Sequence, residues 1–196
     1  MNNTILQIDS SARYQGSLSR ELTQYLSGVL AQRNQAEIIY RDLSASVLPF
    51  VTEKHIGAYY TPKENRSEEQ RQLLVGSDEL ITELRAVNTL VIGAPIYNFS
   101  VPATLKAWID LVCRVGETFQ YGEAGPEGLL DIDNAYIITS AGGTAIGSDI
   151  DFNSQYLQQI CRFIGVKKSH VIDVSGSKRD SDTLIDFAKE QINNII

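Results

Sequence analysis

The chain has 196 residues, of which 43% are hydrophobic and 21% charged, and its formal net charge at pH 7 is −7. This is the composition of an ordinary globular protein, and we expect one domain, residues 1–196, with a sizeable core. The acidic balance argues against nucleic acid as a partner, because phosphate binding needs clustered Lys and Arg.

The start of the chain carries no signal for export, and no apolar run approaches the roughly 20 residues of a membrane helix. We therefore expect a cytoplasmic protein without a membrane partner. Cys113 and Cys161 fall in predicted helices far apart in the sequence, so we interpret them as buried thiols and not as a disulfide. His55 and His170 lie in no local motif and are interpreted as surface or packing residues, and no metal site is expected.

Five apolar, β-branched runs predict the strands of a sheet. They occupy residues 4–9, 36–42, 89–94, 135–140 and 168–174. Helical patterns lie between them, and such alternation predicts an α/β fold with a parallel sheet and helices on both faces. Among the few right-handed topologies for five strands we expect the flavodoxin-like order 2-1-3-4-5, a three-layer sandwich.

The helical patterns differ in clarity. The first stripe, with the i, i+3, i+4 spacing of a helix buried on one face, is Leu22, Tyr25, Leu26, Val29 and Leu30. The last is Leu184, Ala188, Ile192 and Ile195, and weaker patterns cover residues 69–87 and 151–164. After the third strand we expect a helix with Ser100 as its N-cap and Pro102 in its first turn.

Two insertions interrupt this alternation. Residues 43–67 are long for a structureless connection, and residues 114–131 contain four glycines and two aromatics, which suggests a hairpin or a lid. Long loops in a compact domain are more often functional than idle.

Three loops are expected to meet where neighbouring strands end and their connections leave to opposite faces of the sheet. The first, DSSARYQGSLSREL, places Ser11, Ser17 and Ser19 before a helix whose N-terminus would stabilise an anion. It lacks the glycine patterns of dinucleotide and triphosphate loops, so a single terminal phosphate fits better. Alternatively, these serines only cap the helix and solvate the loop.

The second and third loops offer a place for a flat ring. Tyr97, Asn98 and Phe99 form a bend whose aromatic rings and backbone N–H groups suit a planar heteroaromatic ligand, although a core Phe in an ordinary bend is the alternative. Gly142 and Gly143 allow close approach of the backbone and could stabilise negative charge, or could simply form a turn. A phosphate, a flat ring and an anion-stabilising amide pair together indicate FMN, a cofactor that carries the redox chemistry itself.

The same residues carry a resemblance to a known family. PIYNFSVPATLKAWID at 95–110, GPEG at 125–128 and SAGG at 140–143 resemble the bacterial FMN-dependent NADH:quinone oxidoreductases, also called NADH-azoreductases, and the resemblance spans nearly the whole chain. It implies a flavodoxin-like homodimer with one FMN per subunit and two active sites at the subunit interface. It also implies ping-pong chemistry: hydride passes from NADH or NADPH to the flavin, and two electrons then pass to a quinone or an azo compound.

The resemblance also assigns residues. The expected FMN contacts are Ser11, Ser17, Leu18, Ser19, Ile96, Tyr97, Asn98, Phe99, Ser140, Gly142 and Gly143. Tyr121 and Phe163 correspond to aromatics that relatives place over the ring, which makes them candidate substrate-binding residues. The chain departs from the family at Ala141, where relatives often have a larger, basic residue.

The same fold also serves proteins of other functions. A flavodoxin-type carrier would bind FMN without turning over a substrate of its own, and the acidic charge suits it. The aromatic insertions argue against a carrier, because they offer walls for a substrate pocket and surface for a dimer. A receiver domain needs an acceptor aspartate where Ala94 and Pro95 stand, and a low-molecular-weight phosphatase needs a cysteine in the first loop.

Overall fold

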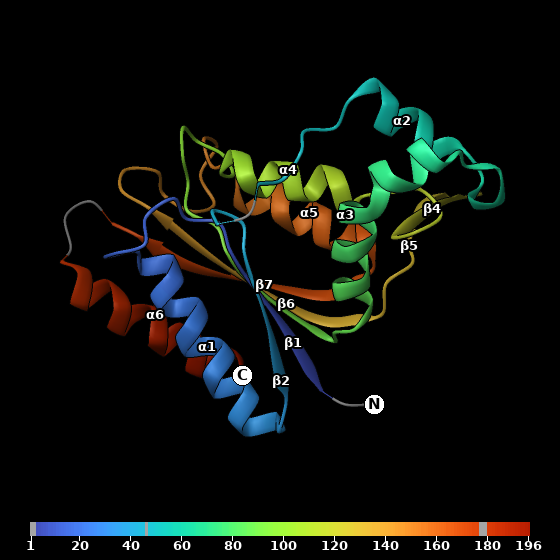
Figure 1. Ribbon diagram of the computed structural model, residues 1–196. Coiled ribbons are helices and arrows are strands. Elements are labelled where there is room, and N and C mark those ends of the chain that lie inside the picture. Colours follow the sequence, from blue (N-terminus) through green and yellow to red (C-terminus); the bar gives the residue numbers. More distant parts are fainter. Residues whose placement is uncertain (1–2, 46, 177–179) are drawn as a thin grey trace.

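A computed structural model describes residues 3–45, 47–176 and 180–196 and contains a five-stranded parallel sheet (Figure 1). Its strands lie in the order β2-β1-β3-β6-β7, with bounds β1 Thr4–Asp9, β2 Glu37–Asp42, β3 Thr89–Gly93, β6 Ile132–Ala141 and β7 Val166–Ser175. Because β4 and β5 form a separate hairpin, this is the predicted order 2-1-3-4-5 of the five main strands. The predicted parallel α/β fold and its strand order are confirmed.

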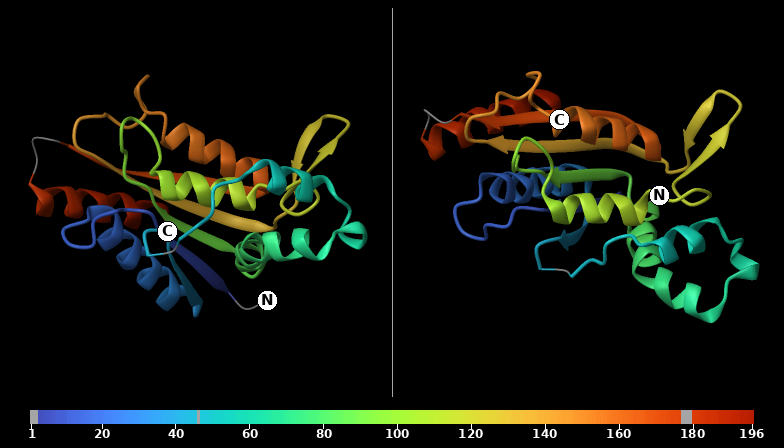
Figure 2. Two further views of the ribbon diagram at one scale, coloured as in Figure 1. Left: turned by 45° about the horizontal axis from the view of Figure 1, so that its top comes forward. Right: turned by 90° about the horizontal axis from the view of Figure 1, so that it is seen from above.

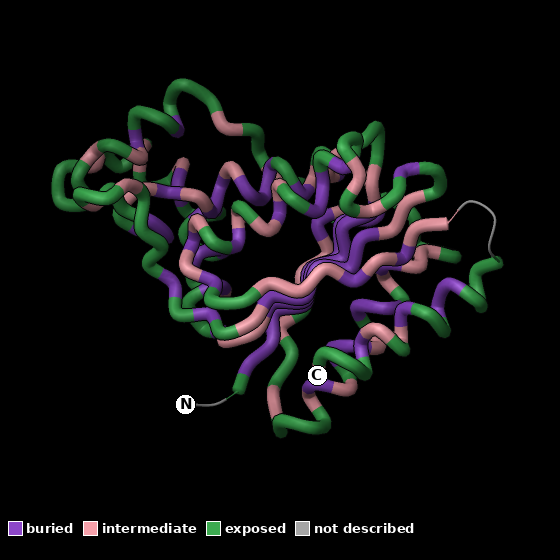
Figure 3. Tube along the Cα trace, turned by 180° about the vertical axis from the view of Figure 1, so that it is seen from behind, coloured by how far each residue is buried: buried purple, intermediate pink, exposed green. Residues whose placement is uncertain are grey.

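Helices cover both faces of the sheet, as predicted (Figure 1). One face carries α1 (Leu18–Asn34) and α6 (Ser181–Ile195), and the other carries α3 (Glu68–Arg85), α4 (Ala103–Val112) and α5 (Ser154–Ile164). Figure 3 shows the buried strands running between these two layers. None of the helices in the described ranges has the length and apolar character needed to cross a bilayer.

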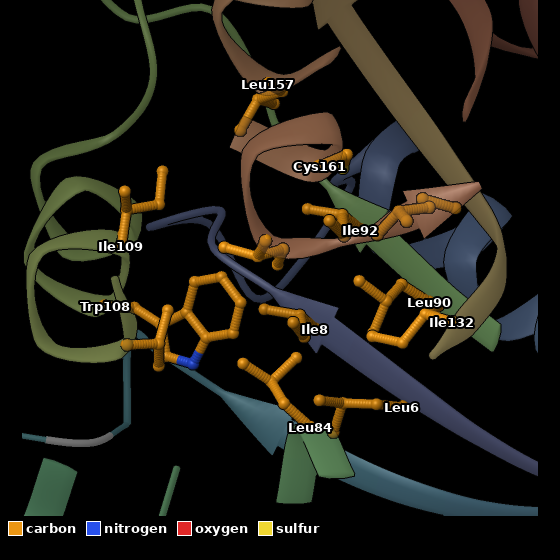
Figure 4. Packing of buried hydrophobic residues seen from close by; sticks show 14 of the residues in the cluster. Leu6, Ile8, Leu84, Leu90, Ile92, Trp108, Ile109, Ile132, Leu157 and Cys161 are labelled. Atoms are coloured by element: carbon orange, nitrogen blue, oxygen red, sulfur yellow. The ribbon is translucent and has the colours of Figure 1, made fainter. Parts of the chain in front are cut away.

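The larger core lies between the sheet and α3, α4 and α5. Side chains of β1 and β3 meet Trp108 and Ile109 of α4 and Leu157 and Cys161 of α5 (Figure 4). Trp108 is 2% exposed, and burying an aromatic of this size stabilises a fold by about 3 kcal/mol relative to leaving it in water. This packing fixes α4 and α5 to the sheet, and with them the loops that precede both helices.

The predicted start of α4 is wrong. Ser100 is not its N-cap: the helix begins at Ala103, and Pro102 occupies the cap position instead of the first turn. Ser100 instead closes a turn with Tyr97. The residue before a proline avoids the helical region of the backbone, so the helix cannot extend toward the N-terminus through Val101. Cys113 follows the last helical residue of α4, so its predicted place inside a helix is also wrong.

Both insertions contain secondary structure. Residues 43–67 include α2 (Glu53–Tyr60) and a short 3₁₀ helix, η1 (Lys63–Asn65), and residues 114–131 form the suggested hairpin from β4 (Phe119–Gly122) and β5 (Gly125–Gly128). The hairpin projects from the end of the sheet where the strands begin (Figure 2). Gly128 there lies against Gly165, so that a Cβ on Gly128 would be 2.1 Å from the Gly165 nitrogen.

The cysteines and histidines have structural roles. Both cysteines are free; Cys161 is buried as expected, whereas Cys113 is only partly buried. Burial raises the pKa of each thiol to about 12, which favours the protonated form at neutral pH. His55 is 3% exposed and caps α2, while His170 stacks on Tyr136 with the ring centroids 5.1 Å apart.

Candidate functional site

Three loops meet at the edge of the sheet where the strands end, as predicted. Hydrogen bonds join the strand ends: Ser10 Oγ donates to the Gly93 carbonyl at 2.7 Å, and Ile96 N donates to the Ser140 carbonyl at 2.8 Å. The loops enclose a cavity of about 310 Å³. Its lining is Ser11, Arg13, Gly16, Ser17, Leu18, Pro95, Ile96, Tyr97, Ser140, Ala141, Gly142, Val174, Gly176, Ser181 and Leu184.

The first loop brings a helix N-terminus to this cavity. Ser17 is the N-cap residue of α1, yet its side chain makes no capping hydrogen bond to the helix, and its hydroxyl lies 3.3 Å from that of Ser19. The hydroxyl therefore stays available beside the first-turn N–H groups, where the helix dipole favours an anion. Arg13 adds a positive charge to the same wall.

The second loop is a tight and strained turn. Tyr97 and Ser100 exchange backbone hydrogen bonds of 3.0 and 3.2 Å, and the two residues between them have positive φ, 50° at Asn98 and 72° at Phe99. Asn tolerates this region, whereas Phe at positive φ costs roughly 1–2 kcal/mol. The turn presents both side chains outward, and Phe99 is 52% exposed.

The hydroxyl of Tyr97 connects this turn to the first loop. It accepts a hydrogen bond from Ala12 N at 3.2 Å and lies 3.4 Å from Ser11 Oγ. Tyr97 thereby forms a wall between the polar cavity and a neighbouring, mostly apolar groove.

That groove has a volume of about 960 Å³ and runs between the first turns of α4 and α5. Its lining is Tyr97, Asn98, Ser100, Val101, Ala103, Lys106, Asp151, Phe152, Gln155, Tyr156 and Gln159. Phe152 is 60% exposed, so a large apolar surface lies open next to the polar cavity.

The third loop is held by two polar side chains. The carboxylate of Asp151 accepts hydrogen bonds from the N–H groups of Gly147, Asn153 and Ser154 and from the Ser154 hydroxyl. Burial alone would raise the pKa of Asp151, but these hydrogen bonds outweigh it and hold the pKa below its usual value. Asn153 Nδ2 donates to the Ala94 carbonyl at 3.0 Å, which ties this loop to the Tyr97 bend.

Most predicted cofactor contacts come together at the cavity. Ser11, Ser17, Leu18, Ile96, Tyr97, Ser140 and Gly142 line it. Of the other predicted contacts, Ser19 is buried next to Ser17, Asn98 lines the groove, and Phe99 lies beside the groove. Gly143 follows Gly142 in the same exposed segment, where an added Cβ would meet nothing within 4 Å.

Tyr121 and Phe163 do not lie at this cavity. Tyr121 belongs to β4, and Phe163 stands near the end of α5, which runs antiparallel to the strands and finishes where β6 and β7 begin. Both residues pack around Phe119, with ring centroids 5.6 and 4.2 Å away. The β4–β5 hairpin lies at the opposite end of the sheet from the three loops (Figure 2). Within one chain these two aromatics cannot cover a ring held by the three loops.

The residues present fit FMN. Hydroxyls, helix N–H groups and Arg13 supply what a single phosphate needs, and the Gly142 segment supplies N–H donors with no side chain in the way. The side chains that line the cavity and the groove include no cysteine or histidine among the residues that the structure describes. Such a site is equipped to hold a redox cofactor and has few groups for acid–base chemistry of its own.

Sequence reasoning missed several residues of the site. Arg13 is the only cation between Ser10 and Ser17, but the phosphate site was predicted from the serines around it. Val174, Gly176, Ser181 and Leu184 form a fourth wall from β7 and α6. No local motif marks them, because only the position of β7 beside β6 brings them to the cavity.

Known proteins are similar to this chain in sequence and in fold. A family model described as a flavodoxin-like fold matches residues 3–196. A protein of Hahella chejuensis named FMN-dependent NADH:quinone oxidoreductase 1 is 50% identical over 189 residues, covering 96% of this chain and 92% of the relative. A protein of the same name from Jannaschia sp. is 44% identical over 188 residues, covering 96% of each chain. The structure of an FMN-dependent NADH-azoreductase from Bacillus anthracis in complex with FMN has the same fold, with a TM-score of 0.85, 21% identity and coverage of 99% and 97%.

Proposed function

Because this chain belongs to the family of FMN-dependent NADH:quinone oxidoreductases, we propose that it is an oxidoreductase that holds FMN at the three loops and reduces quinones and azo compounds with NADH. The supporting observation is the cavity at the carboxyl ends of β1, β3 and β6, which combines anion-binding groups, an aromatic wall and a glycine backbone segment. FMN held there would supply hydride and two-electron chemistry, so that the nicotinamide donor and the acceptor would use the site in turn.

The residues of this chain bind and orient the cofactor. Ser11, Ser17 and the N-terminus of α1 hold the phosphate, with Arg13 neutralising its charge. Tyr97 forms the wall of the ring site, and the Gly142–Gly143 segment supplies N–H donors to negative charge on the ring.

Protons for the acceptor come from water. Asp151 is the carboxylate that lines the groove, and its lowered pKa keeps it ionised at neutral pH, so it cannot serve as a proton donor. Its role is to hold the loop through hydrogen bonds.

The active unit that we propose is a homodimer. Two observations support it: the apolar groove beside Tyr97 is open, and Tyr121 and Phe163 lie far from the cavity of their own chain. In a dimer, the aromatic residues of one subunit would cover the cofactor of its partner. Either NADH or NADPH is proposed as donor, and the cytoplasm, where both are available, as the location.

The decisive experiment is turnover by the isolated protein. We expect the FMN-loaded protein to oxidise NADH rapidly only when a quinone or an azo dye is present, with the parallel double-reciprocal lines of a ping-pong mechanism. Binding of FMN without NADH oxidation, combined with electron exchange with a redox protein, would instead identify an electron carrier. A folded protein that binds no FMN would exclude both functions.

A further inference from the structure

Arg20 lies behind the first loop of the cofactor cavity and holds that loop by a backbone carbonyl. Its Nε and Nη2 atoms donate to the carbonyl oxygen of Ser11 at 3.2 and 2.7 Å. The side chain is 12% exposed and lines a separate cavity on the other side of the loop, together with Tyr40 and Asp42 of the edge strand. Arg20 is therefore placed to act on the cofactor through Ser11 and not by contact.

The guanidinium of Arg20 is fixed in orientation. Asp42 accepts two hydrogen bonds from it, at 2.8 and 2.9 Å, and the Tyr14 ring lies 4.7 Å from its Cζ atom. Ser44 completes the arrangement, because its hydroxyl donates to the same Ser11 carbonyl at 2.8 Å and its N–H donates to Asp42 at 2.9 Å. A planar guanidinium held by two hydrogen bonds has a fixed orientation, so its remaining N–H groups point in a defined direction.

This contact determines where the next N–H group points. In a trans peptide the carbonyl and the following N–H point to opposite sides, so a Ser11 carbonyl held toward Arg20 turns the Ala12 N–H away from it. That N–H donates to the Tyr97 hydroxyl at 3.2 Å on the cavity side of the loop. The Ser11 hydroxyl lies on the same side, beside Tyr97.

We propose that Arg20, oriented by Asp42, is a positioning residue for the phosphate of FMN: it fixes the Ser11–Ala12 peptide so that the Ser11 hydroxyl faces the cavity while the Ala12 N–H is hydrogen-bonded to Tyr97. This inference rests on the proposed function, since it assumes that the cavity holds FMN with its phosphate at the first loop. It predicts a defect that affects flavins with a phosphate and spares flavins without one.

The alternative is that Arg20 and Asp42 only tie α1 to the edge of the sheet. The preceding residue of β2 provides a matched control, because Arg41 forms a two-pronged ion pair with Glu83 of α3. Successive strand residues face opposite sides of a sheet, so this second pair lies on the face away from α1. Breaking it removes a comparable link between β2 and a helix without touching the first loop.

The test compares FMN with riboflavin, which lacks the phosphate. Apoproteins carrying Arg20→Gln, Arg20→Lys, Asp42→Asn or Arg41→Gln are titrated with each flavin by fluorescence quenching, and thermal unfolding is recorded for each. We expect Arg20→Gln to weaken FMN binding about tenfold to a hundredfold, the effect of losing hydrogen bonds to a charged group, and to leave riboflavin binding unchanged. Arg20→Lys should not restore binding, because an ammonium group lacks the planar set of N–H donors that binds Asp42 and the Ser11 carbonyl together.

The other variants make the result specific. Asp42→Asn keeps the guanidinium but releases its orientation, so it should weaken FMN binding in the same direction, and it replaces Arg20→Gln should that variant fail to fold. Arg41→Gln should lower the unfolding temperature and leave both flavin affinities unchanged.

Unchanged FMN binding in Arg20→Gln, or an equal loss of FMN and riboflavin, would overturn the positioning role while leaving the proposed function intact. A wild-type protein that binds no FMN would instead overturn the proposed function.

Discussion

Phe99 is the residue at which local strain and the candidate site coincide. It occupies the second central position of a tight turn with φ 72°, a position that usually belongs to Gly, and half of its side chain remains exposed. Since the exposed ring gains little from burial, folding stability alone does not account for a Phe at this position. Strain of this kind is characteristic of functional sites, and here it presents an aromatic ring beside the groove.

A comparison of two substitutions measures this strain. We predict that Phe99→Gly is more stable than Phe99→Ala by roughly 1 kcal/mol, the reverse of the usual order, because only Gly adopts positive φ without steric cost. Urea unfolding of both variants provides the measurement. Equal stability, or a more stable Ala variant, would show that the turn is not strained at this position.

His55 carries a pH-dependent contribution to stability. It is buried at the start of α2, where its Nδ1 accepts the Thr52 N–H at 3.2 Å, and burial lowers the pKa of the imidazole. The unfolded state then binds a proton more readily than the folded state. This contribution is fully present above a pH of about 6.5, the pKa of an unperturbed His, and is lost as pH falls toward the lowered pKa of the folded protein.

The substitution His55→Gln distinguishes the capping hydrogen bond of His55 from the effect of its protonation. In α3, Gln70 Oε1 accepts the Ser67 N–H at 3.0 Å, so a Gln at the third helical position forms the same cap without a titrating group. We predict that His55→Gln is less sensitive than the wild type to a change from pH 7.5 to 5, as measured by urea unfolding at a series of pH values. A pH dependence identical in the two proteins would contradict this assignment.

At the scale of elements, two glycines determine how the hairpin joins the body of the protein. Gly165 has φ 107°, and a Cβ there would lie 2.3 Å from the Leu130 carbonyl oxygen. The backbone after β5 therefore approaches the end of α5 more closely than any side chain would permit. This contact fixes the position of Tyr121 and Phe163 relative to the sheet.

We predict that Gly165→Ala destabilises the protein by roughly 2 to 4 kcal/mol, because strain at positive φ and backbone overlap act together. Gly76 is the control: it lies in α3, where an added Cβ would meet nothing within 4 Å, and Gly76→Ala should stabilise by roughly 0.5–1 kcal/mol through helix propensity. Chemical unfolding measures both. A tolerated Gly165→Ala would mean that the junction adapts without loss.

The elements also show what sequence patterns can and cannot predict. Hydrophobic periodicity found the five main strands and the helices of the sandwich, because burial against a sheet imposes that periodicity. The prediction that Ser100 caps α4 is wrong because a Ser just before a helix is typical both of an N-cap and of a turn. The backbone hydrogen bonds between Ser100 and Tyr97 show that it closes a turn. Val174 and Leu184 reach the cavity through sheet order alone, so no local pattern could indicate them.

At the scale of the whole molecule, the fold separates two groups of aromatic residues. Tyr97 and Phe152 line the open groove at the ends of the strands, whereas Tyr121 and Phe163 belong to β4 and to the end of α5. The hairpin that contains β4 lies at the opposite end of the sheet (Figure 2). A single chain leaves the first group uncovered and the second without a ligand. A two-fold dimer that places the hairpin end of one subunit over the loop end of the other resolves both, and it does so twice because the interface is symmetric.

Subunit mixing tests this arrangement. Ser17→Asp keeps a good N-cap for α1 but places a negative charge where the phosphate binds, so it should abolish FMN binding in a folded protein. Tyr121→Ala leaves the cofactor cavity intact and removes an aromatic that we propose acts in the partner subunit. In a hybrid dimer of the two variants, one site carries both defects and the other carries neither.

We therefore predict that mixing the two inactive or weakly active variants restores NADH:quinone activity. One of the two sites in each hybrid is intact, so the isolated hybrid should reach about half of the wild-type rate per dimer. The measurement is the reduction rate after co-expression with two different tags and isolation of the hybrid, with each variant mixed with itself as the control. If Tyr121 acted on the cofactor of its own chain, the FMN-binding subunit of the hybrid would still lack it, and the rate would not exceed that of Tyr121→Ala alone.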